Sequence, residues 1–437
     1  MDFTLHSPES MGISSKKILD LAKYLDSHCS MHSMMVARNG KCLFEAYWHP
    51  FNGSLHMMNS FAKSVAVLAV GMAIDEGLIT LEDRPSKLFA EYLPEVYDKR
   101  VDLITVKDLL RMTASTAKRS TNFIGVTSSW ITHYFSHELP CPPGEKFSYE
   151  SGATYMLSAI ISKVYGKTLY DIINERIFIP LGINARWDSS PEGITCGGWG
   201  LYLSLRDMAK LSELFVNLGA YEGRQFVNRE WLKECTKKQV DIKPFAMCDG
   251  YGYQFWTGLN DTFVAFGAIG QISICHPKSG TFIAIQSGCT NKELDLMENA
   301  LAEFFSDTPK TSLPLNDNAF CELKKSAKEF KRKMPNSQRV PKSWSEKYDV
   351  LKIHDDFIEF NDNERHILAG CRYWHGITDN KRAAYSFSND RITITSYDIE
   401  SCFEEEIVLE KDGSRLICTI KKNAAISGNE LITKKSF

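Results

Sequence analysis

Three features are missing from this sequence of 437 residues. No apolar run approaches the ~20 residues that a membrane-spanning helix needs, and the charge-free stretch from Ser64 to Ile74 has only eleven. The net charge of -3 shows no excess of basic residues, which argues against a nucleic-acid or acidic-membrane partner. The first residues, MDFTLHSPESMG, include neither a basic nor an apolar segment, so we expect no secretory signal.

Paired cysteine motifs are also missing. Twelve cysteines occur, but no two of them form a C-x-x-C pair. Without a secretory signal we expect reduced, mostly buried thiols in a cytoplasmic protein. No cysteine spacing indicates a zinc site, and we expect neither a metal nor another cofactor.

The larger part of the chain combines helical and strand patterns. Helical periodicity is present at residues 16–26, 60–77, 153–166 and 204–220. A β-hairpin pattern occupies residues 33–48, and strand patterns occupy 264–277 and 281–288. Because strand patterns occur near both the beginning and the end of this part of the chain, we expect an antiparallel sheet with the helices packed on it.

We therefore predict an α+β fold for residues 1–306, with an antiparallel β-sheet flanked by helices and a helical subdomain. Residues 307–342 carry prolines and few apolar residues, which predicts a linker with one surface helix. Short alternating segments from 343 to 437, such as RITITSY and SRLICTIK, predict a small all-β C-terminal domain.

The segment HMMNSFAKSVAVLAVGMAIDEG (residues 56–77) carries the strongest chemical signal. Residues three apart share one face of a helix, so Ser60 and Lys63 would lie within reach of each other. The apolar run after Lys63 would withdraw its amine from water and favour the neutral form, which can act as a base. A serine hydroxyl needs such a base to become a nucleophile.

The S-x-x-K pattern by itself has low specificity. It also occurs at Ser14–Lys17, in a polar segment, and at Ser115–Lys118, in a loop-like one. An apolar helix follows only Ser60. The alternative interpretation of Ser60 is a helix-capping serine beside a lysine that extends to solvent.

Two further segments could complete a site. Tyr149 follows a Pro-Pro-Gly sequence and precedes an apolar helix, where its phenol could relay a proton; the alternative is an ordinary core or surface tyrosine. The segment AFGAIGQ (265–271) places two glycines in an apolar strand, which indicates close approach of another group to the backbone. An acyl group hydrogen-bonded along that strand would fit, as would a bulged core strand.

Together these segments resemble a known superfamily, the serine hydrolases that include class C β-lactamases, penicillin-binding proteins and related esterases. The resemblance extends over roughly residues 8–305, in a fixed order of segments: HSMMVARNGK, SFAKSVAVLAVGMAIDEGLITLED, TVKDLLRMT, PPGEKFSYES, IPLGI, GGWGLYLSLRDMAKL, YGYQFW and AFGAIGQISICHP. Within it, the A-x-G-x-x-G-Q pattern is most similar to the branch containing 6-aminohexanoate-dimer hydrolase and its esterase relatives.

The resemblance implies a role for each matching residue. Ser60 would be the nucleophile, Lys63 its base and Tyr149 the proton relay. The backbone amides of Ser60 and Ala268 would form the oxyanion hole. The remaining substrate-binding positions would be Ser151, Gly267, Gly270 and Gln271.

Two positions depart from the family pattern. Ser151 stands where the Y-x-N motif has asparagine, and Ala265 stands where a lysine or histidine usually begins the late motif. Loss of that cation favours a neutral ester or amide as the substrate over a β-lactam. The C-terminal residues 343–437 carry no motif that assigns them a role.

The sequence leaves several functions open. An acyl-enzyme esterase or amidase is the main hypothesis, with a small-molecule substrate and no nucleic-acid or membrane partner. A β-lactamase or a D-amino-acid peptidase would use the same residues. A ligand-binding or sensor protein without turnover belongs to a different class. Neither the oligomeric state nor the acyl group follows from the sequence.

Overall fold

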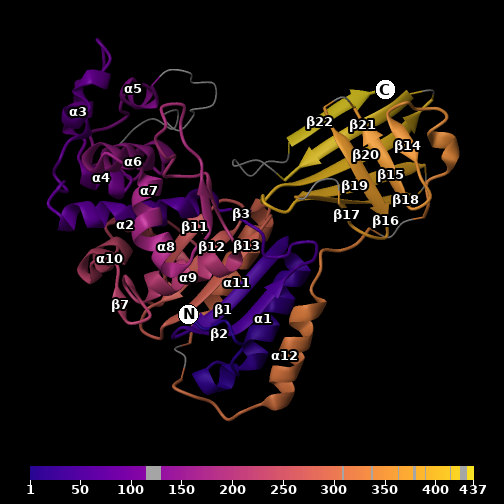
Figure 1. Cartoon of the computed structure of the whole chain (residues 1–437), viewed down its shortest axis with the longest axis horizontal. Helices are drawn as coiled ribbons and strands as arrows, with labels where there is room; N and C mark the ends of the chain where they lie inside the picture. The colour runs from indigo at the N-terminus through magenta and orange to yellow at the C-terminus, as the bar shows by residue number, and fades with distance from the viewer. Residues whose placement is uncertain are drawn as a thin grey trace.

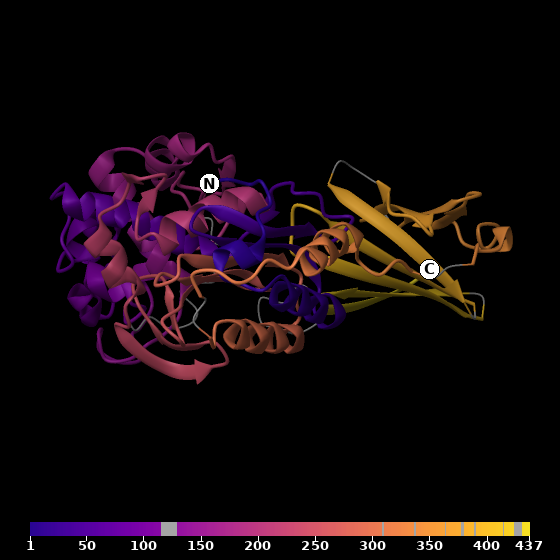
Figure 2. The same ribbon diagram turned by 90° about the horizontal axis from the view of Figure 1, so that it is seen from below.

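The computed structural model describes residues 1–114, 129–307, 310–335, 338–362, 364–376, 380–388, 390–413, 415–423 and 431–437. It confirms the predicted α+β fold, with a helix-flanked antiparallel sheet followed by an all-β region (Figure 1). Seen from below, the helix-rich part and the C-terminal strands occupy opposite ends of the molecule (Figure 2). No helix within the described residues combines the length and apolarity needed to cross a membrane.

The first region is built on an eight-stranded antiparallel sheet in the order β2-β1-β13-β12-β11-β10-β9-β8. Its strands are β1 (Met31–Arg38), β2 (Lys41–Tyr47), β8 (Val240–Phe245), β9 (Cys248–Tyr251), β10 (Trp256–Gly258), β11 (Phe263–Gly267), β12 (Gln271–His276) and β13 (Thr281–Ser287). The predicted pairing of early and late strands is confirmed, because β1 lies between β2 and β13.

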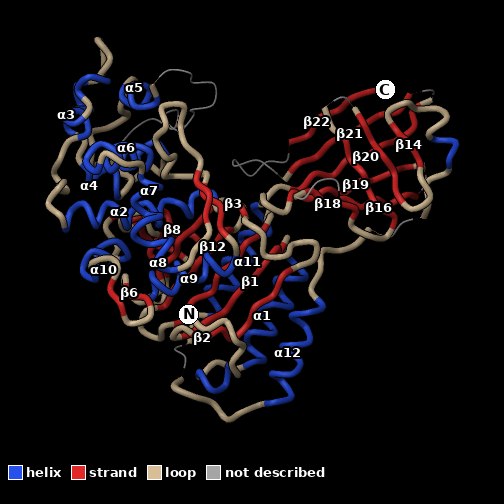
Figure 3. The backbone as a smooth tube through the Cα atoms, viewed as in Figure 1, coloured by secondary structure: helices blue, strands red, loops and turns tan. Residues whose placement is uncertain are grey.

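Alternation along the strands gives the sheet two apolar faces. Met35 and Ala37 of β1 join one buried cluster, whereas Met34 and Val36 join the other. Successive side chains of a strand point to opposite faces, so a fully apolar strand supplies both cores. Helices therefore cover the sheet on both sides, as the blue and red elements of Figure 3 show.

Three long helices cover one face: α1 (Ser15–His28), α11 (Asn291–Phe304) and α12 (Asp317–Glu329). The other face and the helical subdomain contain α2 (Ala62–Asp75), α3 (Pro85–Leu88), α4 (Val106–Leu110), α5 (Trp130–Phe135), α6 (Ser151–Tyr165), α7 (Leu169–Ile173), α8 (Ile179–Leu181), α9 (Leu205–Val216) and α10 (Arg229–Thr236). Short strands β3 (His56–Met57), β4 (Ala185–Trp187) and β5 (Leu201–Leu203) form a separate small sheet, and β6 (Ala220–Tyr221) pairs with β7 (Arg224–Gln225).

Helix α2 is buried on all sides. Every residue from Ala62 to Ala73 is buried, including Lys63. A helix that is apolar all round needs such surroundings. The contact with α10 is so close that a Cβ on Gly71 would lie 2.2 Å from the Trp231 ring. The segment that carries Lys63 is thus held firmly in the core.

The predicted strand at 264–277 is wrong in one respect, because it is two strands. β11 and β12 form a hairpin in which Gly267 pairs with Gln271. The chain reverses over Ala268, Ile269 and Gly270, with positive φ angles at Ile269 (65°) and Gly270 (85°). An apolar sequence hid this reversal, since no polar turn residue interrupts the pattern.

Helix α12 lies within the stretch predicted as a linker. It packs against α1 and β2. Leu323 of α12 and Phe330, which follows it, are buried in the same cluster as α1. The Phe330 ring stacks on Trp48 at a centroid distance of 4.6 Å. The predicted surface helix therefore has one face anchored on the first region.

The C-terminal region forms a nine-stranded sheet: β14 (Leu351–Ile353), β15 (Phe357–Asn361), β16 (His366–Cys371), β17 (His375–Gly376), β18 (Lys381–Ser388), β19 (Arg391–Asp398), β20 (Glu404–Asp412), β21 (Arg415–Lys422) and β22 (Leu431–Ser436). Its own buried cluster includes Trp344, Ile394 and Ile407. Residues 401–403, directly before β20, contact the first region through Cys402.

Candidate active site

Ser60 and Lys63 meet as their spacing predicts. Ser60 lies in a single 3-10 turn (Asn59–Phe61), and Lys63 is the second residue of α2, which continues it. The Nζ atom of Lys63 lies 3.3 Å from the Oγ atom of Ser60. Ser60 is half-buried, whereas Lys63 is only 1% exposed. The hydroxyl is thus accessible and the amine is not.

The Lys63 amine has two further partners. Its Nζ atom lies 2.7 Å from the Oγ atom of Ser151 and 2.8 Å from the carbonyl oxygen of Gly198. An ammonium group can donate to all three oxygens. A neutral amine keeps two N–H donors and one lone pair. With Gly198 and Ser151 taking the donors, the lone pair faces the Ser60 hydroxyl.

Burial favours the neutral amine. Withdrawal from water lowers the pKa of Lys63 from its ordinary value of 10.5 to about 7, partly offset by the Glu150 carboxylate, which raises it. Glu150 is buried and accepts a hydrogen bond from the Tyr134 hydroxyl at 3.2 Å. Near neutral pH a substantial fraction of Lys63 is therefore able to accept a proton.

Tyr149 is also a neighbour of Ser60. Burial raises the pKa of Tyr149 well above its ordinary range, an effect that the neighbouring Ser60 side chain opposes. The Lys63 Nζ atom lies 5.2 Å from the centre of the Tyr149 ring. Trp256 stacks on that ring at 5.2 Å and 25°. Tyr149 is therefore a fixed, protonated phenol beside the serine.

The C-terminal end of β11, at Gly267, lies next to the segment that carries Ser60. A Cβ on Gly267 would lie 2.1 Å from the carbonyl oxygen of Met58 and 3.1 Å from the Phe61 nitrogen. The group that approaches this glycine is thus the segment around Ser60. Ala268, the next residue, is half-exposed.

The other late-motif positions, Gly270 in the turn and Gln271 directly after it, contact Ser287. A Cβ on Gly270 would meet the Ser287 Oγ atom at 2.1 Å. Gln271 is fully buried, and its amide donates to the Ser287 carbonyl at 2.8 Å. The Ser287 hydroxyl donates to the Ile269 carbonyl at 2.8 Å. Gly270 and Gln271 therefore both pack against Ser287, and this packing supports the Ala268–Gly270 turn.

Sequence reasoning missed Gly198 and Asn59. Gly198 lies in the segment GGWG, and a Cβ there would lie 3.0 Å from the Lys63 Nζ atom. Asn59 has a φ of 49°, in the left-handed region that asparagine tolerates better than most residues. Its side-chain amide donates to the Ala268 carbonyl at 2.9 Å. An asparagine directly before the serine was the available signal.

The other S-x-x-K sequences have different settings. The Ser14 side chain caps α1 by accepting from the Lys16 amide, and Lys17 lies 3.8 Å from the Asp307 carboxylate at the surface. Ser115 and Lys118 lie outside the described residues. Of the two described sequences, only Ser60–Lys63 joins a half-buried serine to a buried lysine.

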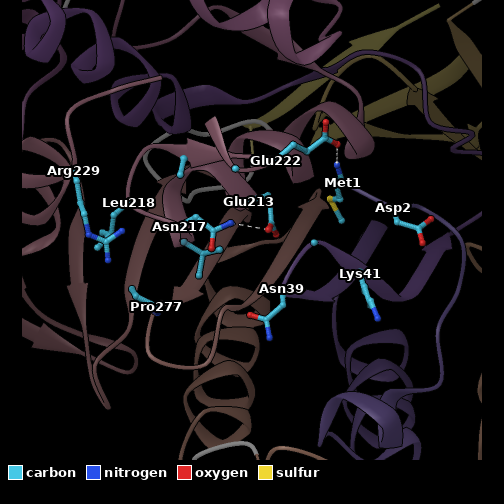
Figure 4. A pocket seen from close by; sticks show the side chains of 14 residues that line it. Met1, Asp2, Asn39, Lys41, Glu213, Asn217, Leu218, Glu222, Arg229 and Pro277 are labelled. Carbon is cyan, nitrogen blue, oxygen red and sulfur yellow. Dashed lines mark hydrogen bonds and ion pairs between the residues drawn. The ribbon is translucent and has the colours of Figure 1, made fainter. Parts of the chain in front are cut away.

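A large cavity lies away from these residues. It has a volume of about 720 Å³ and is lined by Met1, the β1–β2 turn at Asn39 and the end of α9 (Figure 4). Of the carboxylates that line the cavity, only that of Glu213 is buried. The Asn217 side-chain amide donates a hydrogen bond to it at 2.7 Å. None of the predicted site residues lines this cavity.

A buried histidine pair brings two ring nitrogens together. The Nδ1 atom of His32 lies 2.8 Å from the Nε2 atom of His56, and burial lowers the pKa of both. No group of three or more His, Cys, Asp or Glu side chains suited to a metal occurs in the described part of the chain.

Comparisons with known structures show the same fold. A putative 6-aminohexanoate-dimer hydrolase from Bacillus anthracis is 21% identical, with a TM-score of 0.59 over 70% of this chain and 87% of its own. An octameric penicillin-binding protein homologue from Pyrococcus abyssi is 16% identical, with a TM-score of 0.53 over 96% and 99%. The hydrolase EstCE1, described as having promiscuous acyltransferase activity, is 15% identical, with a TM-score of 0.55 over 67% and 98%.

Sequence comparison gives the family. No curated protein matches the chain significantly. The model of the Beta-lactamase family matches residues 26–293, which is more than half of the chain. This match shows that the protein belongs to the Beta-lactamase family.

Proposed function

We propose that the protein hydrolyses uncharged carboxylic esters or amides through an acyl-enzyme formed on Ser60. Membership of the Beta-lactamase family supports a serine hydrolase in general terms. The observation that carries the specific proposal is the buried Lys63 amine, 3.3 Å from the Ser60 hydroxyl and with two other oxygens to hold its N–H groups.

Acylation would begin with attack of the Ser60 Oγ atom on the substrate carbonyl carbon, as the hydroxyl proton passes to Lys63. The amides of Ser60 and Ala268 would hold the resulting oxyanion. The close approach of Gly267 to Met58 and Phe61 supports this assignment, because it brings the two amide-bearing segments together.

The leaving group then needs a proton as its bond to the carbonyl carbon breaks. The Tyr149 phenol remains protonated because burial raises its pKa, so it can donate that proton and recover one from Lys63. Water would next attack the acyl carbon and give its proton to the same residues, which releases the acid and restores Ser60.

The substrate is proposed to be neutral beside the reacting bond. Ala265, where relatives of the superfamily carry a cation, is a buried apolar residue on β11. The Tyr149 side of the site is aromatic: Trp256 stacks on Tyr149, and Phe147 and Tyr251 pack against Trp256 at 5.9 Å and 4.9 Å. Such walls favour apolar acyl or leaving groups.

The test is a set of p-nitrophenyl esters of increasing acyl length, matching p-nitroanilides, and a chromogenic cephalosporin. Wild-type protein should hydrolyse an ester or amide, and Ser60→Ala should reduce kcat by about 10⁴-fold or more with an unchanged thermal melt. Ser14→Ala, which removes the serine of the other described S-x-x-K sequence, should leave kcat unchanged.

The same experiment separates the other functions. Retained turnover in Ser60→Ala would refute the proposal. A fluorophosphonate adduct on Ser60 without turnover of any substrate would instead indicate a ligand-binding or sensor protein. Preference for the cephalosporin would indicate a β-lactamase, and preference for D-aminoacyl anilides a D-amino-acid peptidase.

We also propose that the protein works in a reducing compartment such as the cytoplasm. None of the twelve cysteines, all of them among the described residues, forms a disulfide, and nine are buried, which supports a reducing environment. Cell fractionation with a cytoplasmic marker would test this placement.

A further inference from the structure

The C-terminal region touches the segment that carries the nucleophile. The backbone amide of Met57 donates to the Glu400 carbonyl at 2.9 Å. Two residues later, the Asn59 Nδ2 atom lies 3.4 Å from the Cys402 Sγ atom. Cys402 is fully buried, and Asn59 is 9% exposed. The C-terminal region therefore reaches the residue directly before Ser60.

Both N–H groups of the Asn59 amide have a partner. One partner is the Cys402 sulfur, and the other is the Ala268 carbonyl at 2.9 Å. A primary amide has only two N–H donors, so these contacts fix its plane. Asn59 thus connects the Ser60 segment to the Ala268 turn, while Cys402 holds the amide from behind.

The Ala268 turn needs such support. Ile269 is a β-branched residue with a φ of 65°, a conformation that such residues rarely adopt. The turn is held by the Gln271 amide, 3.3 Å from the Ile269 carbonyl, by Ser287 and, through the Ala268 carbonyl, by Asn59. Holding that carbonyl restrains the Ala268 backbone, and the N–H on the other side of the same Cα is the proposed second donor of the oxyanion hole.

A second contact fixes Cys402 itself. The Asn423 amide donates to the Cys402 carbonyl at 3.1 Å and to the Gly288 carbonyl at 2.9 Å. The residue after Gly288, Cys289, donates its backbone amide to the Ile269 carbonyl at 3.2 Å. The C-terminal region is therefore tied to the same turn from two directions.

We propose that Asn59 and Cys402 are positioning residues for the oxyanion hole, so that the C-terminal β region is a working part of the active site. This inference rests on the proposed function, because it assumes that Ser60 and Ala268 hold an oxyanion. Donors act only when they lie about 2.7–3.1 Å from the developing charge, so a small displacement of the turn weakens transition-state binding.

Full-length variants test the inference. Asn59→Gly keeps the left-handed backbone without strain and removes the side chain with its amide, and Cys402→Ala removes the sulfur. We expect kcat for a p-nitrophenyl ester to fall about 10- to 100-fold in the first, below the loss of a direct donor, and about tenfold in the second. The KM value should change less than about twofold in both, since ground-state binding is not involved.

Affinity for a boronic acid distinguishes a role in positioning the oxyanion hole from a purely structural role, which would leave that affinity unchanged. The Ser60 Oγ atom adds to the boron of phenylboronic acid, its proton passes to Lys63, and one boron-bound oxygen occupies the oxyanion hole. Affinity for this adduct should fall in parallel with kcat/KM in both variants. Cys402→Ser, which keeps a hydrogen-bond acceptor, should recover most of the loss.

Cys418→Ala is the matched control, because Cys418 is another fully buried cysteine of the C-terminal region but contacts none of these groups. It should leave kcat and boronate affinity unchanged. Wild-type values of both quantities in Asn59→Gly and Cys402→Ala would overturn the inference while the proposed function stands. If Asn59→Gly does not fold, Cys402→Ala decides. No labelling of wild-type Ser60 by a fluorophosphonate and no turnover would remove the proposed function and this inference together.

Discussion

The Lys63 Nζ atom lies closer to the Ser151 Oγ atom, at 2.7 Å, than to the Ser60 Oγ atom, at 3.3 Å. The residue that departs from the usual Y-x-N motif is thus the nearest partner of the proposed base. Ser151 is the first residue of α6, so the helix fixes its position. A hydroxyl at this point can orient the amine.

Removal of that hydroxyl should misdirect the amine. We expect Ser151→Ala to lower kcat for a p-nitrophenyl ester about 10- to 100-fold, within the usual contribution of an oriented base. Ser151→Asn, which restores the family motif, should retain more activity. Ser158→Ala removes a buried α6 hydroxyl that donates to the Thr195 carbonyl and should leave kcat unchanged. Equal activity in Ser151→Ala and wild type would contradict this role.

The pH dependence of activity should report the lysine. The pKa of Lys63 is about 7, and only the neutral amine can act as the base, so kcat/KM should rise with pH through about 7 and then level off. Glu150→Gln removes a carboxylate that raises this pKa, which should move the acid limb to lower pH. The exposed Glu145→Gln is the control. An acid limb in Glu150→Gln that stays at the wild-type position would exclude this influence.

The buried lysine should also make stability depend on pH. The unfolded chain keeps the Lys63 proton up to the ordinary pKa of 10.5, whereas the folded chain loses it near 7. The unfolded state therefore binds more protons in this interval, and the free energy of unfolding should increase with pH by at most about 1.4 kcal/mol per unit. Lys63→Met lacks this group, so urea unfolding of both proteins at pH 7 and 9 should show the wild type gaining relative to the variant. A difference that is independent of pH would show that the folded protein keeps Lys63 charged.

Leaving-group dependence should identify the role of Tyr149. Tyr149→Phe removes the phenol that is proposed to protonate the leaving group. The loss of kcat should be about 10²- to 10³-fold for an alkyl ester and smaller for a p-nitrophenyl ester, whose leaving group needs no proton. Tyr155→Phe, which removes an α6 phenol hydrogen-bonded to Ser190 at 3.1 Å, should show no such difference. Equal losses for both substrates in Tyr149→Phe would assign the phenol a positional role only.

An added methyl group at Gly267 should push the end of β11 away from the segment that carries Ser60. The Cβ of Gly267→Ala would lie 2.1 Å from the Met58 carbonyl oxygen, so we expect a loss of roughly 1–3 kcal/mol of stability from overpacking together with a lower kcat. In Gly376→Ala the nearest atom is 3.5 Å from the new Cβ, and the thermal melt should be unchanged. A fully active Gly267→Ala would show that the β11 end can move without cost to catalysis.

The Ser60–Lys63 pair could be predicted because it depends on local geometry. Three residues span one helical turn, and the apolar run that follows Lys63 predicts its burial. The fold class was predictable for a similar reason, since the strand and helix periods of this chain agree with its tertiary structure. Tyr149 required the family resemblance, because nothing near it in the sequence points to Ser60.

The Ala268–Gly270 turn and the Asn59–Cys402 contact could not be predicted in this way. Ile269 has a positive φ angle that its side chain disfavours, and hydrogen bonds from distant residues maintain it. Asn59 and Cys402 are separated by 343 positions. Local periodicity carries no information about such a contact, and neither residue type is unusual on its own.

The anchoring of α12 determines where the protein can be divided. Because Leu323 and Phe330 are buried against the first region, a fragment that ends at residue 306 would expose an apolar strip along α1 and β2. Such a fragment should aggregate, whereas one that ends just beyond Phe330 keeps that strip covered. A protease would accordingly separate the two regions on the C-terminal side of α12.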